Sequence, residues 1–275
     1  MDHHTHNDAA DLADLLDLDA EVLHSYLSDV TEWIGLLAAD RPSRRILDLG
    51  AGTGTGTIAL AQRFAGAQVI AVDSSAEMLS RVRAKALDLG LADRVVTVQA
   101  DLDAAWPAIE PVDVTWASLS LHHLADPDRV LKEVLATLHP GGLFAALEMD
   151  GPLRFLPDDV GAGLEARCHA ALAEEHTAAM PNLGSDWGAR LEQAGFVSIN
   201  RRTFTIDLKA PLSTEAARYA RESLRRFRPA LDRRLGAADL AALDMLIDSD
   251  GPEGLLHRND LNVRGSRTVW VAHRS

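Results

Sequence analysis

Residues 46–56 read ILDLGAGTGTG, an apolar stretch that carries one acidic residue, Asp48, and runs into glycines at every second position. Because glycine has no Cβ, the backbone at such positions can take positive φ angles and approach a ligand closely. The apolar part predicts a strand, and residues 57–64 predict a helix. We therefore expect a strand, a tight ligand-binding turn and a helix.

The glycine spacing distinguishes two nucleotide-binding patterns. The dinucleotide-binding turn has the form G-x-G-x-x-G. Counted from Gly50 or from Gly52, the position of the third glycine holds a threonine. Gly54 and Gly56 with Ala59 match the spacing, but they begin too far beyond the strand. The D-x-G-x-G-x-G run instead resembles the first motif of class I S-adenosylmethionine (SAM)-dependent methyltransferases.

Acidic residues follow the next two predicted strands. Residues 67–72 form a short apolar, β-branched run, typical of a strand buried in a parallel sheet, and the run leads into Asp73. A carboxylate at this strand end is placed to accept hydrogen bonds from ribose hydroxyls. Residues 95–99 predict the third strand, which leads into Asp101 and Leu102, a pair suited to the amine and the face of an adenine.

A fourth strand and a well-marked helix come next. Residues 112–117 predict the strand, which opens into SLSLHHL at residues 118–124. Class I methyltransferases often carry a similar L-H-H segment at this place. Asp126 is a good N-cap and Pro127 suits the first helical position. Residues 143–147 then predict a fifth strand. Five strand-helix units in a row predict a parallel sheet with right-handed crossovers.

The expected fold class is α/β. The resemblance implies a Rossmann-like, seven-stranded and mostly parallel sheet, with helices on both faces and an antiparallel last strand. Residues 187–194, stopped by Gly195, predict a late helix before a strand at 197–208, and residues 267–272 predict the last strand. The resemblance is close over residues 44–150. It is looser over residues 186–208 and 266–273.

Segments outside the sheet are expected to select the substrate. Apolar residues recur at helical spacing over residues 11–39, so residues 1–40 are expected to form a helical extension. In related enzymes such an extension packs over the cofactor cleft. Residues 41–275 are expected to form the methyltransferase domain. Its substrate-side insertions are placed at about 151–185 and 211–265, because loops at the carboxyl ends of such strands form the ligand lid.

The resemblance implies SAM as the cofactor, S-adenosylhomocysteine (SAH) as the product, and no metal. The cofactor-binding residues that it indicates lie at the ends of the first four strands and at the start of the helix after the second. They are Asp48, Gly50, Ala51, Gly52, Gly54, Asp73, Ser74, Met78, Asp101, Leu102, Ser118, Leu119 and His123.

Candidate catalytic residues follow from the reaction, in which a substrate nucleophile attacks the methyl carbon of a sulfonium. A general base is needed where the nucleophile holds its proton firmly. His122 and His123 are the first candidates, since histidine titrates near neutrality. Either of them could instead only cap the loop. Glu148, at the end of the fifth strand, and Asp150 could bind an amine or a hydroxyl, or lie in solvent.

Composition bounds the function. The chain has 275 residues, of which 47% are apolar, and a net charge of −14, which argues against nucleic acid as a partner. No apolar run approaches the length of about 18 residues that a membrane span needs. Cys168 is the single cysteine, so no internal disulfide can form, and the N-terminus lacks a secretory signal. A cytoplasmic enzyme is expected.

One basic segment runs against this acidic balance. It could hold an anionic substrate or partner, or it could be a solvated helix face whose arginine stems cover apolar surface, and the second reading is favoured. Its members are Arg218, Arg221, Arg225, Arg226, Arg228, Arg233 and Arg234.

The predicted function is transfer of a methyl group from SAM to an O, N or C nucleophile of a small-molecule metabolite. Alternatives are another SAM-using transferase on the same fold, or a module that binds SAM and SAH without turnover. An NAD-dependent dehydrogenase would be recognised by its response to NADH. The sequence does not identify the methyl acceptor. It also does not decide whether the protein forms a homodimer.

Overall fold

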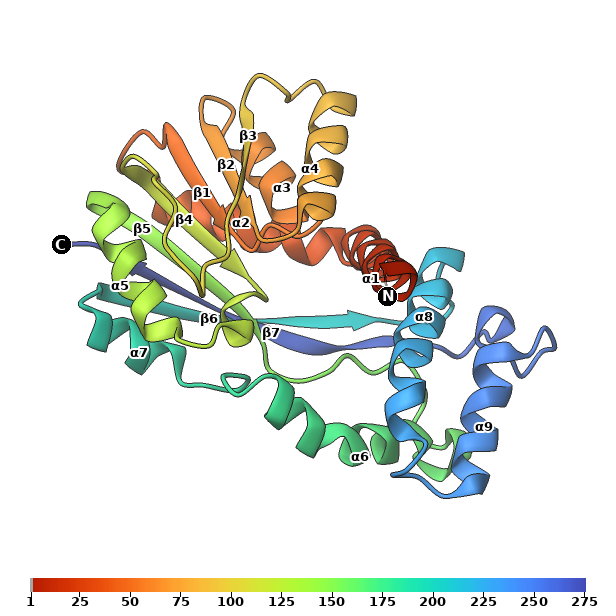
Figure 1. Ribbon diagram of the computed structural model, residues 1–275. Helices are drawn as coiled ribbons and strands as arrows, with labels where there is room; N and C mark the ends of the chain where they lie inside the picture. Colours follow the sequence, from red (N-terminus) through yellow and green to blue (C-terminus); the bar gives the residue numbers. More distant parts are fainter. Residues whose placement is uncertain (1) are drawn as a thin grey trace.

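A computed structural model describes the backbone of residues 2–275 and the side chains of residues 10–173 and 180–275. A seven-stranded sheet in the order β3-β2-β1-β4-β5-β7-β6 forms its centre (Figure 1). Strands β1 to β5 are parallel to their neighbours within that group, and β7 is antiparallel to both β5 and β6. The predicted sheet is confirmed. The strands are β1 (Arg45–Leu49), β2 (Gln68–Asp73), β3 (Val95–Gln99), β4 (Val112–Ser118), β5 (Leu138–Met149), β6 (Val197–Leu208) and β7 (Val263–His273).

Helices cover both faces of the sheet, as predicted. Alternate side chains of a strand point to opposite faces, so Ile46 joins one buried apolar cluster and Leu47 joins another. Helices α2, α3 and α4 pack on the Ile46 face, and α5 and α7 pack on the Leu47 face. These helices are α2 (His24–Leu37), α3 (Thr55–Arg63), α4 (Ala76–Asp88), α5 (Pro127–Thr137) and α7 (Trp187–Ala194).

The link between β3 and β4 corrects the prediction of five strand-helix units. Residues 100–111, all of them described, form turns and irregular backbone without a helix. Pro107 and Pro111 lie in this segment, and proline lacks the backbone N–H that a helix interior needs. Trp106 and Ile109 are partly buried against the Leu47 cluster, so this loop covers the sheet where a helix was expected.

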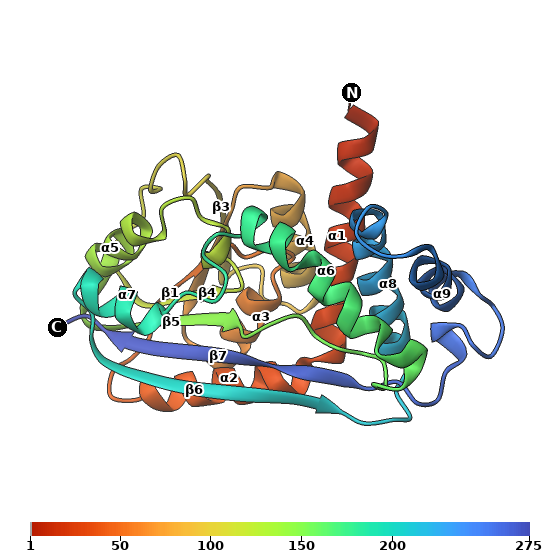
Figure 2. The same ribbon diagram turned by 90° about the horizontal axis from the view of Figure 1, so that it is seen from below.

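The N-terminal extension is helical and begins earlier than residue 11. It consists of α1 (Asp2–Val22) and α2, which are separated at Leu23. Helix α2 packs on the sheet through Val30 and Ile34, whose side chains are 0% exposed. Helix α1 continues beyond the sheet and packs beside α8 (Thr214–Leu231) (Figure 2). The extension therefore joins the Ile46 face of the sheet to the second insertion.

The two expected insertions pack together beyond one end of the sheet (Figure 1). The first contains α6 (Leu164–Ala179), and the second contains α8 and α9 (Ala237–Asp248). Arginines of α8 pair locally: Arg228 binds Asp244 of α9, and Arg225 binds Glu222. These contacts agree with the plainer reading of the arginine-rich segment, a helix face held by its own acidic neighbours.

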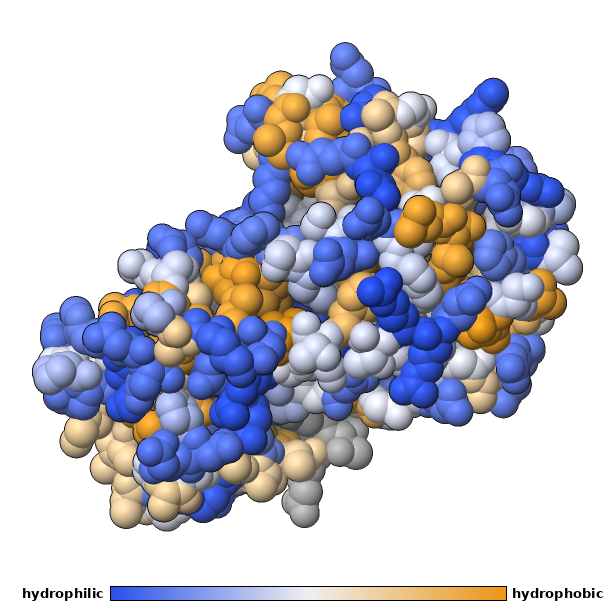
Figure 3. All heavy atoms as spheres, turned by 180° about the vertical axis from the view of Figure 1, so that it is seen from behind, coloured by the Kyte–Doolittle hydropathy of each residue, from blue (hydrophilic) through white to orange (hydrophobic). Residues whose placement is uncertain are grey.

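The surface mixes polar groups with separate apolar patches, and Figure 3 shows this for the face opposite to that of Figure 1. In the part of the chain that the structure describes, no helix is long and apolar enough to span a membrane.

Candidate active site

A cavity of about 530 Å³ opens where the first four strands end. Residues that follow β1, β2, β3 and β4 line it, and residues of α1 and α2 complete its wall. The predicted cofactor residues that line it are Asp48, Gly50, Ala51, Gly52, Asp73, Ser74, Met78, Asp101, Leu102, Ser118, Leu119 and His123. Gly54, also predicted to bind the cofactor, is not among the described residues that line the cavity; it is the N-cap of α3, with a φ of 89°, and faces Val82 of α4.

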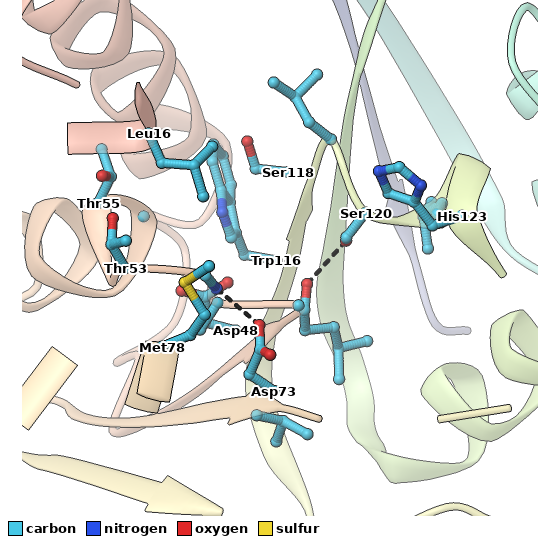
Figure 4. A pocket seen from close by; sticks show the side chains of 18 of the residues that line it. Leu16, Asp48, Thr53, Thr55, Asp73, Met78, Trp116, Ser118, Ser120 and His123 are labelled. Carbon is cyan, nitrogen blue, oxygen red and sulfur yellow. Dashed lines mark hydrogen bonds between the residues drawn. The ribbon is translucent and has the colours of Figure 1, made fainter. Parts of the chain in front are cut away.

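The loop after β1 is fixed by its neighbours on both sides. Gly50 has a φ of 69°, and a Cβ there would lie 2.5 Å from the Cβ of Ser120, so only glycine fits. The backbone N–H of Gly52 donates to Oδ2 of Asp73 at 2.8 Å, and Oγ of Ser120 donates to the carbonyl of Leu49 at 2.8 Å (Figure 4). The ends of three strands therefore hold this loop open towards the cavity.

Asp48 lies at the base of the cavity and is 1% exposed. Its Oδ2 accepts a hydrogen bond from the hydroxyl of Thr57 at 2.6 Å. The pKa of Asp48 is raised to about 7, chiefly by burial and to a smaller extent by the charge of Asp73, while the Thr57 hydrogen bond lowers it. Trp116 lines the same part of the cavity, and its buried Nε1 has no hydrogen-bond partner among the described residues.

Asp73 and Asp101 both face the cavity, but they are held differently. Oδ1 of Asp73 accepts the backbone N–H of Ser75 at 2.8 Å, so both carboxylate oxygens of Asp73 already take part in the local backbone. Ser75 in turn caps α4 by accepting the N–H of Met78 at 3.3 Å. Asp101 is exposed, and its Oδ1 accepts the N–H of Asp103 at 2.9 Å. Each of these carboxylate oxygens has a second lone pair that can accept a further hydrogen bond.

The two adjacent histidines differ in their surroundings. His122, in the 3₁₀ turn Leu121–His123 after β4, is 1% exposed, and its Nδ1 forms a hydrogen bond with Oε2 of Glu148. Glu148 is 2% exposed, and its Oε1 accepts the N–H of Leu121 at 3.0 Å. Neither residue belongs to the described lining of the cavity. The geometry supports a positioning role for the pair, and the catalytic role predicted for both stays a prediction.

His123 is the histidine that lines the cavity. It is exposed, and its ring lies across the cavity from Leu16 and Met78 (Figure 4). Burial of part of the ring and the neighbouring His122 lower the pKa of His123 from its ordinary value of 6.5. The imidazole is therefore mainly neutral at pH 7 and able to accept a proton.

Other sequence candidates lie away from the cavity. Asp150 accepts hydrogen bonds from the hydroxyls of Ser266 at 2.6 Å and Thr268 at 2.8 Å, which tie it to β7. In the described part of the chain, no group of His, Cys, Asp and Glu side chains has the arrangement of a metal site.

Part of the cavity wall was not identified from the sequence. Leu12, Leu16, Asp19 and Ala20 of α1 line it, and Arg267 lines it from β7. The sequence predicted an amphipathic helical extension. Which residues of α1 face the cavity depends on how that helix packs. Arg267 was marked only as the start of a strand.

The fold and the cavity define a class: an α/β protein with a nucleotide-type site at the carboxyl ends of parallel strands. Residues 46–142 match the family model described as a methyltransferase domain. The chain is similar to methyltransferases over this domain, which is about a third of its length.

Named relatives match parts of the chain. Over 100 residues it is 42% identical to trans-aconitate 2-methyltransferase of Azoarcus sp. (strain BH72), covering 36% of this chain and 37% of that protein. Over 174 residues it is 34% identical to malonyl-[acyl-carrier protein] O-methyltransferase of Halorhodospira halophila (strain DSM 244 / SL1), covering 61% of this chain and 54% of that protein. The chain thus spans about a third to a half of these relatives.

A solved structure resembles nearly the whole chain. The crystal structure of a protein of Bacillus halodurans C-125, provisionally assigned as a methyltransferase, has a TM-score of 0.56 and 17% identity. The match covers 89% of this chain and 98% of that one. At this identity the likeness shows the fold, which includes the helical additions as well as the sheet.

Proposed function

We propose that this chain is a SAM-dependent methyltransferase that acts on an O, N or C nucleophile of a small molecule and releases SAH. One observation carries the proposal. The glycine loop, Asp73 and the Asp101–Leu102 pair follow three successive parallel strands and line one cavity. Its volume of about 530 Å³ falls within the range of roughly 300–1,000 Å³ typical of small-molecule sites.

The residues present fit the cofactor. Gly52 has a φ of 52°, a backbone conformation that favours glycine, and a Cβ there would already lie in contact with Leu16 of α1 at 3.5 Å. We assign Asp73 to the ribose hydroxyls, and Asp101 with Leu102 to the adenine, because all three line the cavity. The buried Nε1 of Trp116 is a donor that a ligand atom could satisfy. When bound, SAM supplies the methyl group as an electrophile.

The protein itself positions the methyl acceptor and takes up its proton. Holding the acceptor in line with the methyl group can lower the barrier by roughly 7–11 kcal/mol. Helix α1 forms part of the cavity wall and so excludes water from it. Neutral His123 accepts the acceptor's proton where that proton is not lost beforehand, and the buried His122–Glu148 pair fixes the turn that carries it.

Further parts of the proposal follow from composition and from the relatives. Two relatives are named for trans-aconitate and for a malonyl group, which supports a metabolite acceptor. The net charge of −14 supports a partner other than nucleic acid. The free, buried Cys168 supports a cytoplasmic location. We also propose a helical extension over residues 1–40 and a methyltransferase domain over residues 41–275, with a homodimer allowed.

Isothermal titration with SAH tests the cofactor site. We expect micromolar binding, weakened at least tenfold, or about 1.4 kcal/mol, by Asp73→Ala. Because Asp73 also accepts the N–H groups of Gly52 and Ser75, Asp73→Asn serves beside it as the variant that keeps an acceptor oxygen. Absence of SAH binding by the wild type, with or without binding of NADH, would overturn the proposal.

Turnover is tested separately. Wild-type protein, SAM and a panel of small acceptors are combined with a coupled assay for released SAH. SAH release that depends on one acceptor supports the transferase. Tight SAM and SAH binding without turnover of any acceptor would favour the binding module.

A further inference from the structure

A polar cluster closes the cavity on the side of β7. We call it the Arg267 cluster and define it as Arg267, Asp19, Tyr26 and Tyr219. Oδ1 of Asp19 accepts hydrogen bonds from Nη2 of Arg267 at 2.7 Å and from the hydroxyl of Tyr219 at 2.7 Å. The guanidinium carbon of Arg267 lies 5.2 Å from the ring centre of Tyr26. The cluster therefore joins α1, α2, α8 and β7 at one point.

Arg267 has binding capacity left in this arrangement. It is 7% exposed, and it is the one Lys or Arg among the described residues that line the cavity. A guanidinium has five N–H donors, and the hydrogen bond to Asp19 uses one nitrogen of it. Burying a cation is costly unless its donors find acceptors. A cavity-facing anionic group would accept hydrogen bonds from the other nitrogens of this guanidinium.

The Tyr26 side chain also supports a ligand acceptor at this side of the cavity. Its side chain lines the cavity and is 92% buried, since the residue is 8% exposed, yet its hydroxyl has no hydrogen-bond partner among the described residues. Burial raises the pKa of Tyr26 to about 12, so the hydroxyl keeps its proton and is a donor. Leaving a buried hydroxyl unpaired is unfavourable, because the group has lost its hydrogen bonds to water. A ligand oxygen that reaches both the Tyr26 hydroxyl and the guanidinium of Arg267 would replace those hydrogen bonds.

We propose that Arg267 and Tyr26 form a carboxylate-binding subsite of the cavity. This inference rests on the proposed function and specifies the chemistry of one ligand group. The planar fork of arginine matches a carboxylate, and the tyrosine adds a third donor. Asp19 and Tyr219 orient the guanidinium from behind. The carboxylate belongs either to the amino-acid end of the cofactor or to the methyl acceptor, and the two sources are separated by experiment.

Two tyrosine variants distinguish ligand binding from a purely structural tether. Tyr26→Phe removes a hydroxyl that has no hydrogen-bond partner among the described residues, so its folding stability should stay the same or rise slightly. Tyr219→Phe removes a hydroxyl that bonds to Asp19 and lies outside the described cavity lining. It should lower the melting temperature and, because Asp19 still holds the guanidinium, weaken carboxylate binding less than Tyr26→Phe does. Arg267→Lys is the second probe, because it keeps the charge and loses the fork.

The binding probes are SAH, its decarboxylated analogue S-adenosyl-3-thiopropylamine, and a set of acetate, succinate and tricarballylate added to SAH-saturated protein. If the cofactor supplies the carboxylate, Tyr26→Phe weakens SAH binding about tenfold and leaves binding of the decarboxylated analogue unchanged. If the acceptor supplies it, SAH binding is unchanged, and binding of at least one carboxylate probe weakens about tenfold. In either case, Arg267→Lys should weaken binding of the same ligand that Tyr26→Phe weakens.

The subsite is overturned if folded Tyr26→Phe and Arg267→Lys proteins bind SAH and every carboxylate probe as the wild type does. The proposed function fails in a different way, through absence of SAH binding by the wild type. In that event the carboxylate titrations are run on the free wild type and the two variants, and they decide the subsite by the same criterion.

Discussion

Nδ1 of His122 and Oε2 of Glu148 are hydrogen-bonded inside the protein, where both residues are at most 2% exposed. Glu148 ends the apolar run of β5, and His122 lies in the turn that follows β4, so the pair joins two neighbouring strand ends. The other oxygen of Glu148 takes the N–H of Leu121. The pair thereby fixes the turn that places His123 in the cavity wall.

Removing Glu148 should destabilise the fold. Glu148→Ala leaves His122 and the N–H of Leu121 buried without their acceptor, and breaking a buried pair of this kind costs about 3 kcal/mol or more. Urea unfolding measures the loss. His123→Asn, at the exposed neighbour, is the control and should change stability by less than about 0.5 kcal/mol. Equal stability of Glu148→Ala and the wild type would contradict the positioning role.

Replacing His123 should affect turnover more than binding. If His123 takes a proton from the acceptor, His123→Asn lowers kcat by about 10²–10⁴-fold and changes SAH affinity little. The lowered pKa of His123 in the free protein places the acid limb of the wild-type kcat/KM profile below pH 6.5. Steady-state rates over a pH series give both quantities. An acid limb that survives unchanged in the variant would assign the titration to another group.

Asp48 makes the unliganded protein less stable as pH rises. In the unfolded chain its carboxyl loses a proton near pH 3.8, whereas in the folded protein it holds that proton until about pH 7. Between these values the folded state binds more protons, so this group's contribution to stability falls with rising pH. The fall is about 4 kcal/mol at most, from 1.36 kcal/mol per pKa unit.

Asp48→Asn tests this sign directly. Asparagine does not titrate, and its carbonyl can still accept the hydroxyl of Thr57. The stability of the variant relative to the wild type, from denaturant curves, should therefore increase between pH 4 and pH 7. A difference that stays constant over this range would show that Asp48 is ionised in the folded protein at low pH as well.

Sequence patterns predicted the elements that depend on neighbouring residues. Asp73 follows an apolar run, and Gly50 is required by a local turn, so both positions in the cavity could be predicted. The Arg267 cluster could not, because Asp19 and Arg267 are 248 residues apart and meet only once α1 has packed over β7. The sequence also could not show which of His122 and His123 is buried and which lines the cavity. Adjacent residues in a turn point in different directions, and no periodicity tells which one is buried.

The last prediction concerns the space that Gly56 leaves beside the cavity. A Cβ at this position would lie 2.6 Å from Nε1 of Trp116 and 3.3 Å from Oδ2 of Asp48. Although alanine favours a helix by about 1 kcal/mol over glycine, displacing a fully buried indole costs about 1–3 kcal/mol. Gly56→Ala should therefore lower the melting temperature and weaken SAH binding.

Gly66→Ala is the matched control, since nothing lies within 4 Å of its Cβ position. It should leave SAH affinity unchanged and stability equal or slightly higher. If Gly56→Ala behaved like Gly66→Ala in both measurements, the indole of Trp116 would not be held against the glycine loop as the structure has it.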